Sequence, residues 1–405
     1  MSRILIISSG SPCRNPRPLK EAETLGRAGH EVTLLTVSES PELDAMEQTL
    51  TAGAPFRHES VGRNAAKIGK FLRRAHVRLA MQATAAGLPS LHALGQVGPL
   101  RRQALALPAE LTIIHNEIPF WIGCDLLRLG RRVAADFEDW HSEDLLPDAR
   151  LSRPLAPLRQ LERQLLLNAA YTSTTSAALS AALAARHNAP SPHVLTNSFP
   201  LQPKPRSGPP GTPPAFFWFS QTIGPGRGLE HFLAAWSLTQ KPSRLVLLGE
   251  PCDGYKAQLL NRVPQSFRSR IDFLPLVPPE KLPALIAKHD IGLALEQPFI
   301  RNRDLTITNK ILQYLNAGLA VVASDTAGQR EVLAHQPSAG IIVETHETTA
   351  FAKALDQLLT DHPALSARQT AARALAEQKY CWEHEAPALN ELVATALEKP
   401  SSPRT

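Results

Sequence analysis

The stretch TITNKILQYLNAGLAVVAS, residues 306–324, decides the fold class predicted for this chain. Its first half places apolar residues at helical spacing, and Gly318 ends that pattern before an apolar run at residues 320–323 that is typical of a buried strand. Lys310 lies near the first turn of the predicted helix, where the helix dipole disfavours a cation. A phosphate would compensate, because backbone N–H groups at a helix start and an ammonium group both bind anions. The residues alone leave open whether Lys310 binds phosphate or is an ordinary surface lysine.

The same alternation of short apolar runs and helical patterns continues along both halves of the chain. In the first half, strands are expected at residues 4–8, 31–37, 111–115, 132–136, 171–174 and 193–197. In the second half they are expected at residues 215–220, 244–248, 271–274, 291–295, 320–323 and 340–343, again with helical patterns between them. Such βαβ alternation predicts an α/β fold with two Rossmann-like, doubly wound domains.

A proline-rich segment separates the two halves. Seven of the fifteen residues in PLQPKPRSGPPGTPP, residues 200–214, are proline, which excludes a helix or a central strand there. We therefore predict domains at residues 1–199 and 215–382, joined by a semi-rigid linker. The tail, residues 399–405, is expected to be disordered.

Composition narrows the class of protein. The 405 residues suffice for two cores, and the four cysteines form no CxxC pair, so neither a zinc site nor a disulfide framework is expected. The N-terminus reads as a first strand, not as a signal peptide, and no apolar run is long enough to span a bilayer. These features predict a cytoplasmic protein.

The net charge of +6 is unevenly distributed. No acidic residue lies between Glu59 and Glu110, and basic residues at residues 63–79 recur on one face of a predicted amphipathic helix. This face is either solvated or binds an anionic membrane surface, which would place the protein peripherally at the inner face of the cell membrane. The segment has few aromatic residues and no nucleic-acid-binding module, so we expect no nucleic-acid partner.

The residues around Lys310 carry a family resemblance. Asn309, Lys310, Tyr314, Gly318 and the pair Ala323-Ser324 resemble the donor-sugar half of glycosyltransferases with the GT-B fold, and within them glycosyltransferase family 4. The resemblance implies two Rossmann-like domains facing across a cleft, and a helix at residues 383–398 that packs back on the N-terminal domain. It also implies a nucleotide-diphospho-sugar donor substrate and no tightly bound cofactor or metal.

The resemblance extends to other donor-binding positions, with two departures. Arg227-Gly228 matches the second half of a GR…KG pattern whose cations grip the diphosphate, but the earlier arginine position is Gln221. The family glutamate that binds ribose falls on Gln313, which can hydrogen-bond but brings no charge. The implied donor-binding residues are Arg227, Lys310, Asn309, Gln313, Gln221, Gly224, Thr306 and Leu274.

The acceptor side is expected at the ends of the N-terminal strands. In DFEDWHSED, residues 136–144, the resemblance makes Glu138, Asp139 and His141 candidates for orienting the acceptor hydroxyl or accepting its proton, although acids are also common at a helix start. Arg14 and Arg17 are expected to point into the cleft. His115 and Asn116 end a strand and are either cleft or core residues. The acceptor and cleft candidates are Ser11, Arg14, Arg17, His115, Asn116 and Asp136.

The resemblance implies a retaining glycosyltransferase acting on a glycan or lipid-linked acceptor in cell-surface polysaccharide or lipopolysaccharide biosynthesis. One alternative is a nucleotide-sugar epimerase or hydrolase with the same fold. The other is a non-catalytic nucleotide-sugar-binding or scaffold protein, for which Gln221 and Gln313 are the evidence.

Overall fold

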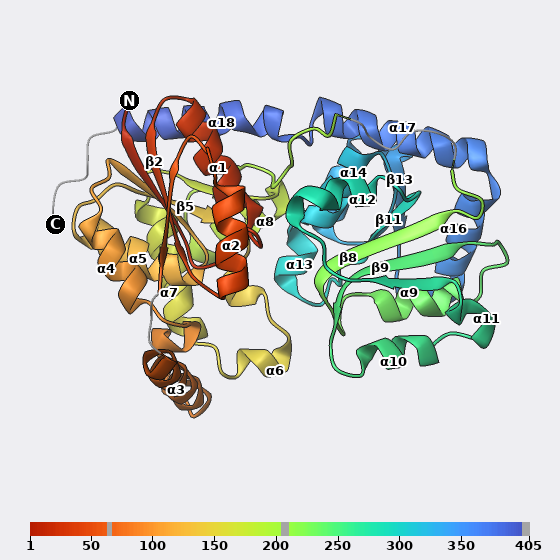
Figure 1. Cartoon of the computed structure of the whole chain (residues 1–405), viewed down its shortest axis with the longest axis horizontal. Helices are drawn as coiled ribbons and strands as arrows, with labels where there is room; N and C mark the ends of the chain where they lie inside the picture. The colour runs from red at the N-terminus through yellow and green to blue at the C-terminus, as the bar shows by residue number, and fades with distance from the viewer. Residues whose placement is uncertain (63–66, 204–209, 399–405) are drawn as a thin grey trace. The chain divides into compact units, whose positions relative to one another are not determined.

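The structure is a computed structural model that describes residues 1–62, 67–203 and 210–398, without the side chains of residues 67–73. The chain forms two compact units, one containing residues 1–195 with the chain from Ala386 onward, the other residues 196–385. Each unit has a parallel sheet flanked by helices (Figure 1). The predicted α/β class with two doubly wound sheets is therefore confirmed. The predicted boundaries at residues 199, 215 and 382 stay predictions, and residues 204–209 of the linker and the tail 399–405 lie outside the described residues.

Unit 1 is built on a seven-stranded parallel sheet in the order β3-β2-β1-β4-β5-β6-β7. Its strands are β1 (Arg3–Ser8), β2 (Glu31–Val37), β3 (Arg57–Val61), β4 (Leu111–His115), β5 (Val133–Phe137), β6 (Thr172–Thr174) and β7 (His193–Val194). In the centre Ile6 pairs with Leu34 on one side and Ile113 on the other. The central strands are almost wholly buried, because helices cover both faces of a parallel sheet.

The helices of unit 1 connect these strands. They are α1 (Pro16–Arg27), α2 (Pro41–Leu50), α3 (Lys67–Ala85), the 3-10 helix η1 (Leu91–Leu94), α4 (Gly98–Ala106), α5 (Glu117–Arg128), η2 (His141–Glu143), α6 (Pro147–Arg150), α7 (Leu155–Asn168) and α8 (Ala177–His187). The side chain of Asn15 caps α1 by accepting a hydrogen bond from the Arg17 backbone N–H. Pro16 suits the first helical position, because proline has no backbone N–H that would need a partner there. The last helix, α18 (Trp382–Glu398), begins in unit 2 and ends in unit 1.

Unit 2 is built on a six-stranded parallel sheet in the order β10-β9-β8-β11-β12-β13. Its strands are β8 (Ala215–Ile223), β9 (Arg244–Pro251), β10 (Ile271–Leu274), β11 (Ile291–Ala294), β12 (Ala320–Ser324) and β13 (Gly340–Val343). Its helices are α9 (Leu229–Trp236), α10 (Tyr255–Asn261), α11 (Gln265–Arg268), η3 (Pro279–Lys281), α12 (Leu282–Ile286), α13 (Arg301–Leu305), α14 (Asn309–Ala317), α15 (Ala327–Ala334), η4 (Pro337–Ala339), α16 (Thr348–Thr360) and α17 (His362–Gln378).

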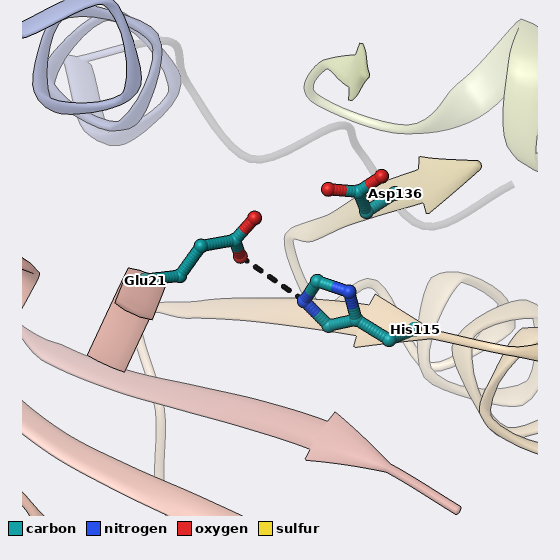
Figure 2. Close-up of side chains that lie close together, drawn as sticks. All are labelled: Glu21, His115 and Asp136. Carbon is teal, nitrogen blue, oxygen red and sulfur yellow. Dashed lines mark hydrogen bonds and ion pairs between the residues drawn. The ribbon is translucent and has the colours of Figure 1, made fainter. Parts of the chain in front are cut away.

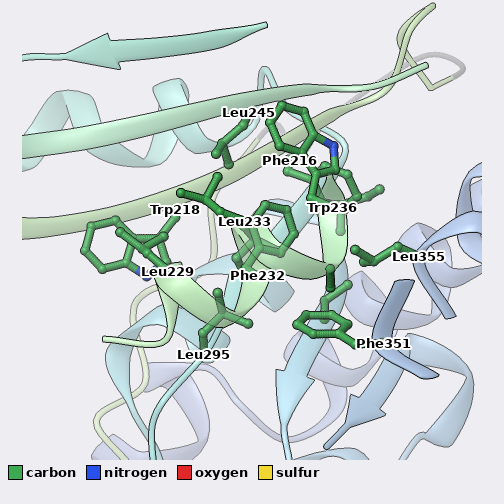
Figure 3. Packing of buried hydrophobic residues seen from close by; sticks show 14 of the residues in the cluster. Phe216, Trp218, Leu229, Phe232, Leu233, Trp236, Leu245, Leu295, Phe351 and Leu355 are labelled. Atoms are coloured by element: carbon green, nitrogen blue, oxygen red, sulfur yellow. The ribbon is translucent and has the colours of Figure 1, made fainter. Parts of the chain in front are cut away.

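Two apolar clusters hold the unit 2 sheet between its helices. On one face Phe216 and Trp218 of β8 pack with Phe232 and Trp236 of α9 and Phe351 of α16 (Figure 3). On the other face the buried side of α14 packs in a second cluster that contains Ile311, Leu312, Tyr314 and Leu315. Burial of this kind stabilises the fold by about 25 cal/mol for each Å² of apolar surface. Residues 306–324, which decided the predicted fold class, therefore also contribute to the core.

The strand orders locate one topological switch point in each sheet. In unit 1 the order reverses between β1 and β4, and in unit 2 between β8 and β11. Ligands of open α/β sheets bind outside the carboxyl ends of the strands at such a point. The loops after these four strands are therefore where a functional site is sought.

Three sequence predictions need correction at the level of elements. The sequence did not predict β3, whose residues are only half-buried and lack an apolar run. The strand expected at residues 193–197 covers only His193–Val194. Gln221 lies within β8 instead of the loop that follows it, because the strand continues to Ile223 past a register shift between Phe219 and Thr222.

Candidate functional site

The loop after β8 lies directly against the end of β11. Gly226 and Gly228 both adopt left-handed conformations, with φ of 73° and 77°. A Cβ atom on Gly228 would lie 2.3 Å from the backbone oxygen of Leu295, so only glycine allows this approach. The close contact places half-buried Arg227 at the switch point of unit 2.

Lys310 lies beside the same switch point, in the first turn of α14. The side chain is almost buried, and its Nζ atom is 2.7 Å from Glu296 Oε1 and 5.6 Å from the ring centroid of Trp218. Burial would raise the pKa of Glu296, but the charge of Lys310, followed by those of Arg227 and Arg303, lowers it below its ordinary value. Glu296 is therefore a carboxylate surrounded by cations.

Polar atoms at the start of α14 have no hydrogen-bond partner within the described protein. Thr308 is the N-cap residue but its side chain caps no backbone N–H, and its buried Oγ1 atom is unpartnered. The Oε1 atom of Gln313, one turn further along the helix, is also buried and unpartnered. Because unsatisfied buried polar atoms are unfavourable, these two oxygens are available to accept hydrogen bonds from a ligand or water.

A short chain of hydrogen bonds holds the loop that carries Glu296. Gln329 Nε2 donates to Ser324 Oγ at 2.8 Å, and Ser324 Oγ donates to the backbone oxygen of Glu296 at 2.5 Å. Ser324 and Gln329 are both buried. The end of β12 and the start of α15 thus hold the backbone of the residue that pairs with Lys310.

The remaining predicted donor residues occupy different depths of unit 2. Thr306 is buried and donates to the backbone oxygen of Asn302 at 2.7 Å, and Asn309 is the first, half-buried residue of α14. Gly224 is buried in the loop after β8, and half-buried Leu274 ends β10. Gln221 is exposed.

In unit 1 the switch point contains a buried network of charged side chains. Arg17 of α1 is fully buried, and its Nε donates to Asp136 Oδ2 at 2.6 Å while its Nη1 donates to the Leu195 backbone oxygen at 2.6 Å. His115, at the end of β4, lies 3.0 Å from Glu21 Oε2 through Nε2 and 2.9 Å from Glu138 Oε1 through Nδ1. Figure 2 shows Glu21, His115 and Asp136 converging from α1, β4 and β5.

Burial and charge compete within this network. Burial would lower the pKa of His115, but the charges and hydrogen bonds of Glu21 and Glu138 raise it to about 10. Burial would raise the pKa of Glu21, but His115 and Arg17 lower it to about 2. For Asp136, burial outweighs Arg17 and raises the pKa to about 7. We therefore describe His115 as an imidazolium between two carboxylates.

Arg17 was expected to point into the cleft, but within unit 1 its side chain is fully buried. Its guanidinium is enclosed by Asp136, Glu21 and the end of β7, because three carboxylates in the interior require a cation. Ser11, His115 and Asp136 are also buried, and their assignment to the acceptor side stays a prediction. One oxygen or nitrogen from each of Glu21, His115 and Asp136 lies within 4.8 Å of the others, a spacing that a metal ion could use. Arg17 already supplies positive charge there.

Glu138 is the member of the network nearest to solvent. Its side chain is 11% exposed, and its Oε1 accepts hydrogen bonds from both His115 and Asn15 Nδ2. His141 belongs to a different pair, with Nδ1 3.1 Å from Glu117 Oε2. Asp139 lies half-buried between them in sequence. Glu138 and His141 therefore pair with different residues.

A cavity of about 460 Å³ adjoins the switch point of unit 1. It is lined by the ends of β1 and β2, by α3 and by the loop before α4, and Arg74 and Arg78 are its cationic lining residues. Arg14 is half-exposed and is tied to this cavity through Glu39, a lining residue. Its Nη1 atom lies 2.6 Å from Glu39 Oε2. Asn116, with φ of 72°, accepts from Ser8 Oγ at 2.9 Å.

The basic segment at residues 63–79 is described in part. Arg63 and the side chains of residues 67–73 lie outside the described residues, whereas Arg74, Arg78 and Leu79 are exposed on α3. Over the described parts of the chain, no helix has the length and apolar character needed to cross a bilayer.

Several functional candidates were not identified from the sequence. Glu296 and Arg303 lie in the polar segment EQPFIRNRD, residues 296–304, and Glu21 lies inside a helix. The loop position after a strand was a usable signal for Glu296. No sequence signal pointed to Glu21, because its partners come from distant strands.

Comparison with known proteins identifies relatives of the second unit. Residues 213–361 match the family model described as "Glycosyl transferases group 1". The candidate glycosyltransferase YtcC of Bacillus subtilis (strain 168) is 25% identical over 131 residues. This match covers 32% of the chain and only 31% of the length of that curated relative.

The whole fold resembles solved glycosyltransferases at low sequence identity. Sucrose-phosphate synthase from Thermosynechococcus elongatus superposes with a TM-score of 0.73 at 14% identity, covering 97% of this chain and 98% of that one. HepE of Anabaena, solved with UDP-glucose, gives 0.69 at 15% identity, covering 98% and 100%. WaaG, a glycosyltransferase involved in lipopolysaccharide biosynthesis, gives 0.63 at 14% identity, covering 96% and 99%. Residues 213–361 are therefore similar to a glycosyl transferases group 1 domain, within a chain that shares the two-unit α/β fold of these solved enzymes.

Proposed function

We propose that this protein is a retaining glycosyltransferase of family 4 that transfers a sugar from a nucleotide-diphospho-sugar to a glycan or lipid-linked acceptor. The observation that carries the proposal is the convergence of Arg227 and Lys310 on the switch point of unit 2, beside the uncapped start of α14. Backbone N–H groups, an ammonium and a guanidinium are together suited to a diphosphate. The family match at residues 213–361 supports the same reaction class.

The proposed role of these groups is to stabilise the leaving group. As the bond between the anomeric carbon and the diphosphate oxygen breaks, negative charge grows on the nucleotide, and the two cations neutralise it. The acceptor hydroxyl oxygen bonds to the anomeric carbon on the same face, and its proton passes to the departing diphosphate. Lys310 is held by Glu296 at 2.7 Å, so its ammonium is already oriented when the donor binds.

The proposed acceptor site is the cavity of unit 1 next to β1 and β2. Arg74 and Arg78 give it a positive wall, which favours an acceptor with an anionic group such as a phosphate-linked glycan. Glu138 would orient the acceptor hydroxyl, since it is the most exposed member of the buried network. The basic segment at residues 63–79 would bring the protein to an anionic membrane surface, and WaaG is a fold relative involved in lipopolysaccharide biosynthesis.

Lys310 is the decisive test of the proposed function. Lys310→Ala and Lys310→Met are expected to reduce donor turnover by orders of magnitude, measured as nucleotide released from a panel of UDP-, ADP- and GDP-sugars with glycan acceptors. Because removing the lysine leaves Glu296 buried without its partner, the double variant Glu296→Gln/Lys310→Met serves as a folding control. A folded Lys310→Met variant with unchanged turnover would remove Lys310 from the site.

The same panel separates the proposal from its alternatives. Nucleotide release that needs no acceptor would identify a hydrolase, and conversion of the donor sugar without release an epimerase. If calorimetry detects no binding of any nucleotide sugar by the wild-type protein, the glycosyltransferase proposal fails in favour of a scaffold protein.

A further inference from the structure

Arg303 lies in the loop that approaches Arg227 from the neighbouring strand. It is a half-buried residue of α13, in the segment between β11 and α14. Its Nη1 atom donates a hydrogen bond of 3.0 Å to the backbone oxygen of Gly226, the residue immediately before Arg227. The guanidinium of Arg303 is thereby attached to the loop that carries one of the two proposed phosphate-binding cations.

The same region lacks a cation at a second position. Gln221, which stands where the resemblance places an arginine, is exposed in β8 and carries no charge. A cation from another element would restore the charge of the site without changing the fold. Arg303 is suitably placed, since β8 and β11 are neighbours and their carboxyl ends meet at the switch point.

We propose that Arg303 is a third diphosphate-binding residue, which supplies from the β11–α14 segment the cation that is missing at Gln221. The inference rests on the proposed function, because it presumes that Arg227 and Lys310 bind a nucleoside diphosphate. A guanidinium has five N–H donors, so the bond to Gly226 and a contact with phosphate do not exclude each other. Its planar fork also fits two phosphate oxygens better than an ammonium does.

The charge balance around Glu296 agrees with this assignment. Glu296 is close enough to Lys310, Arg227 and Arg303 for all three to lower its pKa. The nearby carboxylate of Asp304 accepts a hydrogen bond from the Ala327 backbone N–H at 3.0 Å, and Glu230 is bound to the Tyr255 hydroxyl at 2.5 Å. The guanidinium of Arg303 is therefore near enough to Glu296 to act on the same charged region as Lys310 and Arg227.

The test asks whether residue 303 contributes its positive charge to ligand binding or only its hydrogen bond to Gly226. Calorimetry would measure the affinity of the wild type for UDP, ADP and GDP, and then of Arg303→Ala, Arg303→Gln and Arg303→Lys for the tightest of them. We expect about a 10-fold or greater loss for Arg303→Ala and Arg303→Gln, and a smaller loss for Arg303→Lys. The same substitutions should weaken binding of the corresponding nucleoside monophosphate by a smaller factor. Arg301→Ala, an exposed arginine of the same helix, is the matched control and should bind as the wild type.

A compensating substitution makes the test specific. In the double variant Gln221→Arg/Arg303→Ala, the restored arginine should recover part of the lost diphosphate affinity. If Arg303→Gln binds as tightly as the wild type, Arg303 only holds the Gly226 loop and the inference is overturned. If Arg227→Ala and Lys310→Met also bind as tightly as the wild type, or the wild type binds no nucleotide, the proposed function itself fails.

Discussion

The two switch points use charged residues in opposite ways. In unit 1, Arg17 and His115 are enclosed by Glu21, Asp136 and Glu138, so the cations and carboxylates satisfy one another in the interior. In unit 2, the charges of Lys310, Arg227 and Arg303 all lower the pKa of the buried carboxyl of Glu296. Similar topology therefore places two cations among three carboxylates in one sheet, and three cations about one buried carboxylate in the other. Under the proposed function, the first network positions residues, whereas the cations of the second bind the diphosphate of the donor.

The largest effect expected from this comparison is on stability and concerns Arg17. Arg17→Met should lower the free energy of unfolding by about 3–5 kcal/mol, because it leaves buried carboxylates without their partner. Chemical denaturation would measure this. Arg27→Met, which removes an exposed ion pair with Glu23 on the same helix, should cost less than about 1 kcal/mol. Equal effects of the two substitutions would contradict the described network.

The reverse pattern is expected for Arg227. Arg227→Ala should weaken nucleoside diphosphate binding by about 100-fold while changing stability little, because the residue is half-buried and serves the ligand. Calorimetry and thermal melting together would show this separation. The matched control is Arg244→Ala, at the opposite, amino end of β9, which should leave binding unchanged. A large loss of stability in Arg227→Ala would assign the residue to the fold instead.

The pH dependence of stability should show whether His115 of unit 1 is charged or neutral in the folded protein. A folded-state pKa of about 10 for His115 lies above the ordinary value, so its stabilising contribution is complete below about pH 6.5 and is lost as the pH rises toward 10. The gap in melting temperature between the wild type and His115→Gln should therefore narrow between pH 7 and pH 10. Calorimetric scans at both values, with the exposed His193→Gln as control, would measure it. A constant gap would mean that His115 is neutral in the folded protein.

The smallest expected effect concerns the exposed arginines of α3. Arg74→Gln/Arg78→Gln should reduce flotation with phosphatidylglycerol vesicles at low salt, since each cation near an anionic surface contributes about 1 kcal/mol. Donor binding should not change. The double variant Arg163→Gln/Arg186→Gln removes two exposed arginines elsewhere in unit 1 and should float as the wild type. Identical flotation of both double variants would exclude this face from membrane contact.

Local patterns in the sequence predicted most of the elements. Strand β2 and strand β4 have the bounds expected from their apolar runs, and α14 and β12 occupy the stretch that suggested the fold. Where the pattern was weak, as at the half-buried β3, prediction failed because no apolar face marked the strand. The resemblance to group 1 glycosyltransferases was also readable from residues 306–324, and the family match to residues 213–361 confirms it.

The sequence by itself determined the α/β class, the two sheets and the candidate cations Arg227 and Lys310, because periodicity and short motifs are local properties. The tertiary structure decided which charges meet. Arg17 is within a turn of Glu21, but it meets Asp136 more than a hundred residues away, and Glu296 meets Lys310 only because β11 and α14 end and begin at one edge of the sheet. Such pairings depend on strand order, which no local pattern encodes.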